Sequence, residues 1–205
     1  MNIHVIDDFL PEEWVEPVYT AISTSKFVFA DHTVALIYSD LPKYSGDLLK
    51  KVHDSPQLVS TYMENNILEE SATPFLPYLF AGVLASKTGM DTTKILRCKA
   101  NLNIPELNRD SDSFYTPHVD FSDLCGVEDF VTAIYYANDS TGDTFFFSLG
   151  EENELKELHR IEPKRNRIVY FDGSIIHAGS PPASGKRIVL NMDFVTTFKQ
   201  PKSEA

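Results

Sequence analysis

The second half of the chain alternates between apolar and polar residues, which is the period of a strand with one buried face. From residue 97 to 104 the apolar positions are even-numbered and the polar ones odd-numbered. Further strands are predicted at residues 131–137, 144–148, 157–161, 167–172, 175–178 and 187–195, with turn residues between them. About seven or eight short strands at this spacing predict a sandwich or jelly roll.

The first 92 residues predict a helical layer with some strand. Strands are expected at residues 3–6 and 33–38, and helices after Asp8 and at residues 44–53, 58–68 and 75–87. Pro11 and two acids favour the start of the first helix, and Gly89 favours the end of the last one. We expect these helices to cover one outer face of the sheet.

Length and composition predict a single domain over residues 1–205. A chain of 205 residues with 42% hydrophobic residues can bury a core without disulfides or metals as staples. Within it, residues 1–92 are expected to form the helical support layer and residues 93–199 the jelly-roll core. Residues 200–205 are expected to be a flexible tail.

The charge of the chain limits its partners. Thirty acidic residues against 18 basic ones give a formal charge of −12, which repels nucleic acids and anionic membranes. The two cysteines do not suggest a disulfide framework. The polar N-terminus does not fit a signal peptide, and the longest apolar stretch is too short to cross a bilayer. These features predict a cytoplasmic protein with neither nucleic acid nor membrane as a partner.

Three residues form a candidate metal site. His118 and Asp120 are two positions apart, so on a strand both side chains point to the same face. His177 lies on a later predicted strand that a jelly roll would bring opposite them. Two histidines and one carboxylate can hold Fe(II) and leave coordination positions open. The His-x-Asp pattern alone is common by chance, so the hypothesis depends on all three residues together.

Arg187 adds a candidate anion site ten residues beyond His177. In its strand, Arg187, Val189 and Asn191 share one face, and the alternate residues form an apolar face suited to packing under helices. The arginine therefore faces the interior of the predicted barrel. A buried guanidinium requires an anion, and a bound dicarboxylate would supply one.

With these residues the chain resembles the 2-oxoglutarate and Fe(II)-dependent dioxygenases, and within them the prolyl-4-hydroxylase-like branch. The similarity covers most of the chain. It is carried by the opening at residues 6–11, by Tyr115-Thr-Pro-His-Val-Asp120, by residues 131–138, by Gly142-Asp-Thr-Phe145, and by residues 167–172 leading to His177 and Arg187. The fold that this implies is a double-stranded β-helix, the cupin-like form of the jelly roll.

The resemblance also implies a cofactor set and residue roles. His118, Asp120 and His177 would bind Fe(II), with 2-oxoglutarate as cosubstrate and O2 as oxidant. Arg187 and Tyr136 would anchor the far carboxylate of the cosubstrate, and Ile134 would wall it. Asn103 stands where many members have a second tyrosine, so the residue that replaces this phenol is open. The candidates are polar residues that otherwise satisfy strand edges, namely Asn101, Asn103 and Asn191.

The implied reaction is hydroxylation of an unactivated C–H bond, because halogenating relatives lack the carboxylate that Asp120 supplies. The substrate would be a prolyl residue of a peptide or protein, or a free amino acid or similar small molecule. The acidic loops at residues 106–113 and 122–129 favour a cationic or proline-containing target. Two other readings are a non-oxygenase cupin-like metalloenzyme and a binding module with a vestigial site. Neither the oligomeric state nor the pathway follows from the sequence.

Overall fold

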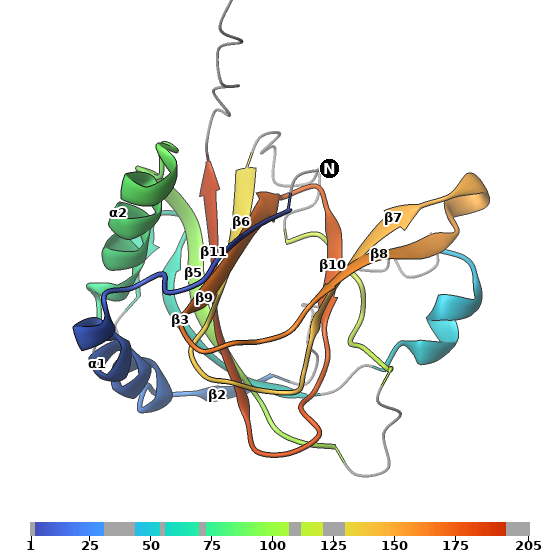
Figure 1. Cartoon of the computed structure of the whole chain (residues 1–205), viewed down its shortest axis with the longest axis horizontal. Helices are drawn as coiled ribbons and strands as arrows, with labels where there is room; N and C mark the ends of the chain where they lie inside the picture. Colours follow the sequence, from blue (N-terminus) through green and yellow to red (C-terminus); the bar gives the residue numbers. More distant parts are fainter. Residues whose placement is uncertain are drawn as a thin grey trace, which may run out of the picture.

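The computed structural model describes residues 3–30, 44–53, 56–69, 73–106, 112–120 and 130–195. Within these ranges the chain is mostly β, with a larger and a smaller sheet facing each other across the interior (Figure 1). The helices lie on the outer face of the larger sheet. The predicted strand at residues 33–38 and the predicted tail lie outside the described residues, as does Cys125.

The described elements follow one another in a simple order. The larger sheet has the order β1-β9-β6-β11-β5-β3-β2, with β4 paired to β3, and the smaller has the order β10-β7-β8. The helical elements are α1 (Glu12–Ser23), α2 (Leu76–Thr88) and the 3-10 turns η2 (Asp47–Lys51) and η4 (Glu151–Asn153). The strands are β1 (Ile3–Ile6), β2 (Val28–Ala30), β3 (Gln57–Glu64), β4 (Ile67–Leu68), β5 (Lys94–Asn103), β6 (Phe130–Tyr136), β7 (Thr144–Leu149), β8 (Leu155–Ile161), β9 (Arg167–Asp172), β10 (Ile176–Gly179) and β11 (Arg187–Val195). The predicted fold class, a jelly roll with helices on one outer sheet face, is confirmed.

Alternation along the strands separates the core from the interior of the barrel. Met192 of β11 pairs with Cys98 of β5 on one side and with Ala133 of β6 on the other. All three are buried in the cluster that the helices cover. The neighbouring positions Lys99 and Asn191, which also pair with each other, line a pocket on the opposite face. The alternation predicted for β5 and β11 is therefore confirmed.

The helices join the larger sheet through an aromatic core. The Phe80 ring of α2 lies 4.7 Å from the Tyr135 ring of β6 and 5.8 Å from the Phe9 ring, which precedes α1. Gly89 ends α2 as expected, with a φ of 72° and its N–H donating to the carbonyl of Ala85 at 2.8 Å. No helix within the described ranges is long and apolar enough to span a membrane.

Two predicted helices differ in the structure. Residues 58–68 form a hairpin of β3 and β4 instead of a helix. Its turn places Asn65 and Asn66 at φ values of 51° and 62°, the left-handed conformation that asparagine tolerates. Residues 44–53 contain only the short turn η2, and Leu48 packs with the core on the smaller sheet. That segment therefore does not belong to the layer over the larger sheet.

Phe80→Ala tests the aromatic core under α2. Because Phe80 is fully buried, we expect the substitution to lower the free energy of unfolding by about 3–5 kcal/mol. Urea denaturation measures this change. Tyr78→Ala on the same helix is the control, since Tyr78 is 56% exposed and should change stability by less than about 0.5 kcal/mol. Equal effects of the two substitutions would contradict the packing described above.

Candidate metal centre

The three candidate ligands lie together at one end of the space between the sheets. The ligand atoms of His118, Asp120 and His177 all lie within 4.8 Å of one another. The carboxylate oxygens of Asp120 lie 3.4 Å from Nε2 of His177 and 3.9 Å from Nε2 of His118. Among the described residues this is the group whose chemistry and spacing suit a metal ion. Two imidazoles and one carboxylate are the donors that Fe(II) sites use.

Backbone pairing brings the two histidines side by side. The N–H of each donates to the carbonyl of the other at 2.9 Å, so His118 continues the smaller sheet beyond β10. Nδ1 of His118 lies 2.9 Å from the Thr116 carbonyl, and Nδ1 of His177 lies 3.1 Å from the Ile175 carbonyl. With Nδ1 donating to these carbonyls, each Nε2 presents its lone pair to the cluster. Nε2 of His177 is buried without a hydrogen bond, so its lone pair is left for a metal ion.

Electrostatics favour the forms of these side chains that bind metals. Burial, together with the neighbouring His177, lowers the pKa of His118 to about 3, so its imidazole is neutral at pH 7. Burial alone would raise the pKa of Asp120, but the Arg97 guanidinium and His177 hold it well below its usual range. Neutral imidazoles and an ionised carboxylate are what a divalent cation requires.

A polar network behind Asp120 fixes this carboxylate. The Arg97 guanidinium contacts Asp120 and lies 2.9 Å from Oδ2 of Asp193. The Thr132 hydroxyl lies 2.8 Å from Oδ1 of Asp193 and 3.3 Å from Oδ2 of Asp120. Burial raises the pKa of Asp193 to about 7 against the opposing effect of Arg97. The alternation of residues 97–104 puts Arg97 on the polar face of its strand, but no sequence pattern predicts this network.

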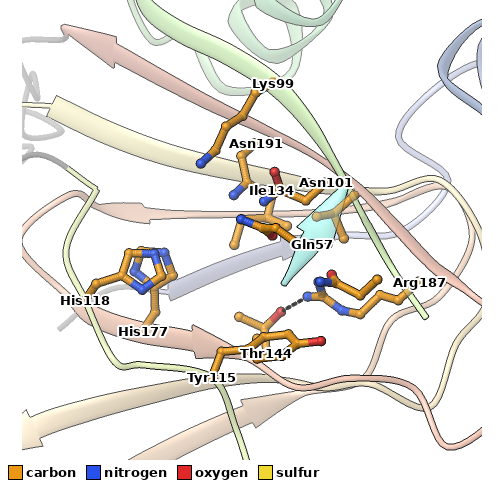
Figure 2. Close-up of a pocket in the computed structure, with 13 residues that line it drawn as sticks. Gln57, Lys99, Asn101, Tyr115, His118, Ile134, Thr144, His177, Arg187 and Asn191 are labelled. Atoms are coloured by element: carbon orange, nitrogen blue, oxygen red, sulfur yellow. Dashed lines mark hydrogen bonds between the residues drawn. The ribbon is translucent and has the colours of Figure 1, made fainter. Parts of the chain in front are cut away.

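The two histidines of the candidate metal site lie at one end of a pocket (Figure 2). One wall of this pocket consists of rows of paired residues on the inner face of the larger sheet. One row joins Lys99, Asn191 and Ile134 of β5, β11 and β6, and the next joins Asn101 and Val189. Because alternate residues of a strand share a face, each row follows the previous one by about 7 Å. The pocket is lined by Gln57, Lys99, Asn101, Asn103, Tyr115, His118, Ile134, Thr144, His177, Gly179, Arg187, Val189 and Asn191.

Arg187 closes the other end of the pocket. Its Nε donates to the Gly142 carbonyl at 2.7 Å and its Nη2 to the Thr144 hydroxyl at 3.0 Å. The Tyr136 hydroxyl donates to the same Thr144 oxygen at 2.8 Å. Arg187 is 4% exposed, and no carboxylate among the described residues forms an ion pair with it. Burial accordingly lowers the pKa of Arg187, although an arginine remains charged.

Gly142 makes room for this arginine. A Cβ at Gly142 would lie 2.4 Å from the Ser180 carbonyl oxygen and 2.9 Å from Cδ of Arg187. Any side chain at this position would therefore displace the backbone of residue 180, the guanidinium, or both. This close approach explains why a glycine stands at the turn before β7.

The structure brings most of the predicted pocket residues together. Asn103, Ile134 and Asn191 line the pocket. Tyr136 does not line it, but it lies on the same inner face, with its ring centroid 5.9 Å from Cζ of Arg187 and its hydroxyl bonded to Thr144. The sequence analysis did not propose a site role for Gln57, Lys99, Tyr115 or Thr144. The alternation of β5 had placed Lys99 on the polar face, and Tyr115 opens the motif that contains His118. Gln57 carried no such signal, because its strand was taken for a helix.

Several amides in the pocket lack partners. Oδ1 of Asn101, Nδ2 of Asn103 and Oδ1 of Asn191 are buried without a hydrogen bond. Buried polar atoms are normally paired, so three orphans in one pocket leave it open to a polar ligand or to water. Nε2 of His177 can bind a metal ion, and Nδ2 of Asn103 and the guanidinium of Arg187 can donate to an anionic ligand.

Comparison with known proteins agrees with this geometry. The sequence model of the 2OG-Fe(II) oxygenase superfamily matches residues 105–194, the stretch that carries His118, Asp120, His177 and Arg187. This stretch of the chain is similar to the superfamily. Fe(II) and 2-oxoglutarate, which give the superfamily its name, are the groups to which this similarity points. A search of curated protein sequences found no match.

Solved structures share the fold at low sequence identity. A Pseudomonas putida prolyl-4-hydroxylase aligns with a TM-score of 0.54 and 16% identity over 95% of this chain and 92% of its own. A 2OG-Fe(II) family oxidoreductase from Burkholderia pseudomallei aligns with a TM-score of 0.58 and 12% identity, over 94% and 84% of the two chains. A Trichoplax adhaerens prolyl hydroxylase was solved in complex with a hypoxia inducible factor peptide fragment. It aligns with a TM-score of 0.56 and 16% identity, over 94% of this chain and 83% of its own.

Arg97→Gln tests the network behind Asp120. Without the guanidinium two buried carboxylates lose their cation, so we expect the free energy of unfolding to fall by about 3–5 kcal/mol. Mn(II) affinity, measured by electron paramagnetic resonance titration, should fall by about 10- to 100-fold. Lys94→Gln, at the exposed start of the same strand, should change neither quantity. Unchanged Mn(II) affinity in folded Arg97→Gln would contradict a supporting role for this arginine.

Gly142→Ala tests the close approach to Arg187. We expect the added Cβ to destabilise the protein by about 1–3 kcal/mol through overpacking, measured by urea denaturation. The matched control is Gly82→Ala within α2, where nothing lies within 4 Å of an added Cβ. That substitution should stabilise the protein by about 0.5–1 kcal/mol, because alanine favours helix interiors. Stability changes of the same sign in the two variants would contradict the close contact described at Gly142.

Proposed function

We propose that this oxygenase holds Fe(II) with His118, Asp120 and His177, and anchors the far carboxylate of 2-oxoglutarate with Arg187. Its reaction is the hydroxylation of an unactivated C–H bond. The substrate is a prolyl residue of a peptide or protein, or a free amino acid. Fe(II), 2-oxoglutarate and O2 together supply the oxidising power, while the residues of the chain position the reactants.

The observation that carries the proposal is the buried guanidinium of Arg187, which has no ion-pair partner among the described residues and lies in the same pocket as the candidate metal ligands. A guanidinium in this environment needs an anion, and the described residues provide no carboxylate ion pair for it. A dicarboxylate that binds Arg187 with one carboxylate and the metal ion with its other end would supply a partner to both. A cupin-like isomerase or lyase would have no use for this second anion site.

Neighbouring residues hold the anchor in place. Thr144 accepts hydrogen bonds from Arg187 and from Tyr136, so its own hydroxyl hydrogen remains available to a carboxylate. This arrangement supports an indirect role for Tyr136, which orients Arg187 through its ring and through Thr144. Tyr115 lines the pocket beside Arg187 and helps to keep its pKa from falling further. We therefore assign the place of the second phenol to Tyr115, in preference to Asn103.

The apolar part of the pocket excludes water. Ile134 and Val189 belong to a buried cluster between the sheets together with Phe146 and Phe171. The Phe171 ring lies edge-on to His177 at 5.0 Å between centroids. Apolar groups at this position keep the effective dielectric low and strengthen each charge–charge contact within the site. These residues protect the reactants and take no part in proton transfer.

The assignment of substrate class rests on likeness of fold. Two solved structures with this fold are prolyl hydroxylases, and one of them was solved with a peptide fragment. That likeness supports a prolyl residue as the target, and the resemblance of the sequence motifs leaves a free amino acid as the other choice. Of the two acidic loops expected to select the substrate, residues 107–111 and 121–129 lie outside the described residues.

An anaerobic titration with Fe(II) and 2-oxoglutarate tests the proposal. The intact protein should develop a metal-to-ligand charge-transfer band in the visible range. His118→Ala should abolish this band. Arg187→Met should keep the band but weaken 2-oxoglutarate binding by roughly 10- to 100-fold, because at least one charge-assisted contact is lost.

Lys156→Met serves as the control for Arg187→Met, since Lys156 is exposed at the edge of the smaller sheet and pairs only with Glu154 among the described residues. No band with the intact protein would overturn the proposal. If Arg187→Met shows the band and binds 2-oxoglutarate with normal affinity, only the assignment of Arg187 as the anchor is overturned.

A further inference from the structure

Lys99 is a cation inside the pocket with no function in the scheme above. Its side chain reaches into the pocket from β5, on the side of the two histidines, while Arg187 enters from the far end (Figure 2). Among the described residues it forms neither a hydrogen bond nor an ion pair. Burial and the nearby Arg97 lower the pKa of Lys99 to about 8, so the amine still carries its proton at pH 7.

The position of Lys99 in the sheet separates it from the other two buried cations of the site, Arg97 and Arg187. Lys99 pairs with Asn191 across β5 and β11, one row from Arg97 and Asp193 and two rows from Asn103 and Arg187. Arg97 already serves the two aspartates, and Arg187 is held by Gly142 and Thr144. Lys99 therefore lies on the sheet wall at the end of the pocket nearer to the metal ligands, away from Arg187.

Lys99 has no ion-pair partner of its own among the described residues. Asp120, Asp193 and Glu64 favour its charged form only from a distance, and both aspartates lie against Arg97. A cation in a pocket of low dielectric is costly unless an anion joins it. An anionic group of the substrate would supply this partner.

Resting on the function proposed above, we infer that Lys99 is a specificity-determining residue that binds a carboxylate of the substrate. The carboxylate stands close to the carbon that is hydroxylated. It is supplied by a free amino acid, by the C-terminal residue of a peptide, or by an acidic side chain next to the target residue. An internal residue flanked only by neutral or basic residues does not meet this requirement.

The neighbours of Lys99 support a small polar group at this place. Asn191 and Asn101 line the pocket beside it, and their Oδ1 atoms are buried without hydrogen bonds. Since the amide can be turned, the NH2 groups of these asparagines can donate to the same carboxylate. One ammonium and two amides on a sheet wall form a donor set suited to two carboxylate oxygens.

The test compares matched carboxylates and amides as probes. The first arm uses the free L-amino acids, proline included, against their amides. The second uses N-acetyl-L-proline against N-acetyl-L-prolinamide, and the third uses the capped dipeptides Asp-Pro and Glu-Pro against Asn-Pro and Gln-Pro. Binding is measured without turnover, as the perturbation of the charge-transfer band of the anaerobic Fe(II)–2-oxoglutarate complex. Probe-stimulated succinate formation is measured separately in air.

In at least one arm the carboxylate should bind roughly 10- to 100-fold tighter than its amide, the range of one charge-assisted contact. Lys99→Met should remove this preference and Lys99→Arg should restore part of it. Both variants should keep the 2-oxoglutarate affinity of the unaltered protein within about twofold. The control Lys94→Met changes an exposed lysine on the same strand and should leave the preference intact.

Three results would overturn the inference while leaving the proposed function standing. They are a normal band with no carboxylate preference in any arm, a preference that persists in Lys99→Met, and a loss of 2-oxoglutarate affinity of tenfold or more in Lys99→Met. The last would make Lys99 a cosubstrate ligand. A missing band in the unaltered protein is a different failure, because it overturns the proposed function and this inference with it.

Discussion

The site depends on one backbone interaction, the reciprocal pair of hydrogen bonds between His118 and His177. These 2.9 Å bonds join two segments that lie far apart in the chain and bring both imidazoles to the same point. The backbone carbonyls of Thr116 and Ile175 then turn each ring so that Nε2 faces Asp120. The positions of the two histidines are thus set by backbone pairing in the smaller sheet.

The larger sheet supplies the complementary half of the site. Its outer face carries the apolar core under α1 and α2, and its inner face carries rows of polar residues that run from Arg97 to Arg187. Asp120 joins the two halves, since it belongs to the histidine segment but is held by Arg97 and Thr132 of the larger sheet. The cofactor site therefore forms only when both sheets face each other in the correct register.

The sequence predicted the second half of the chain better than the first. The alternation in β5 and β11 has a strict period of two, so it identified both the strands and their faces. The segment of β3 and β4 was wrongly predicted as helical, because its strand character comes from pairing with β5 and from a two-asparagine turn. The network of Arg97, Thr132 and Asp193 was missed, since three strands contribute one residue each and no local pattern connects them.

Alternation also has an evolutionary consequence. From residue 98 to residue 103 of β5 the even-numbered residues pack with the core and the odd-numbered residues line the pocket. A change at position 99 or 101 can therefore alter the lining of the pocket without disturbing the packing beneath the helices. Pocket lining and core packing depend on different residues of the same strand, so the pocket can diversify one substitution at a time while the fold is preserved.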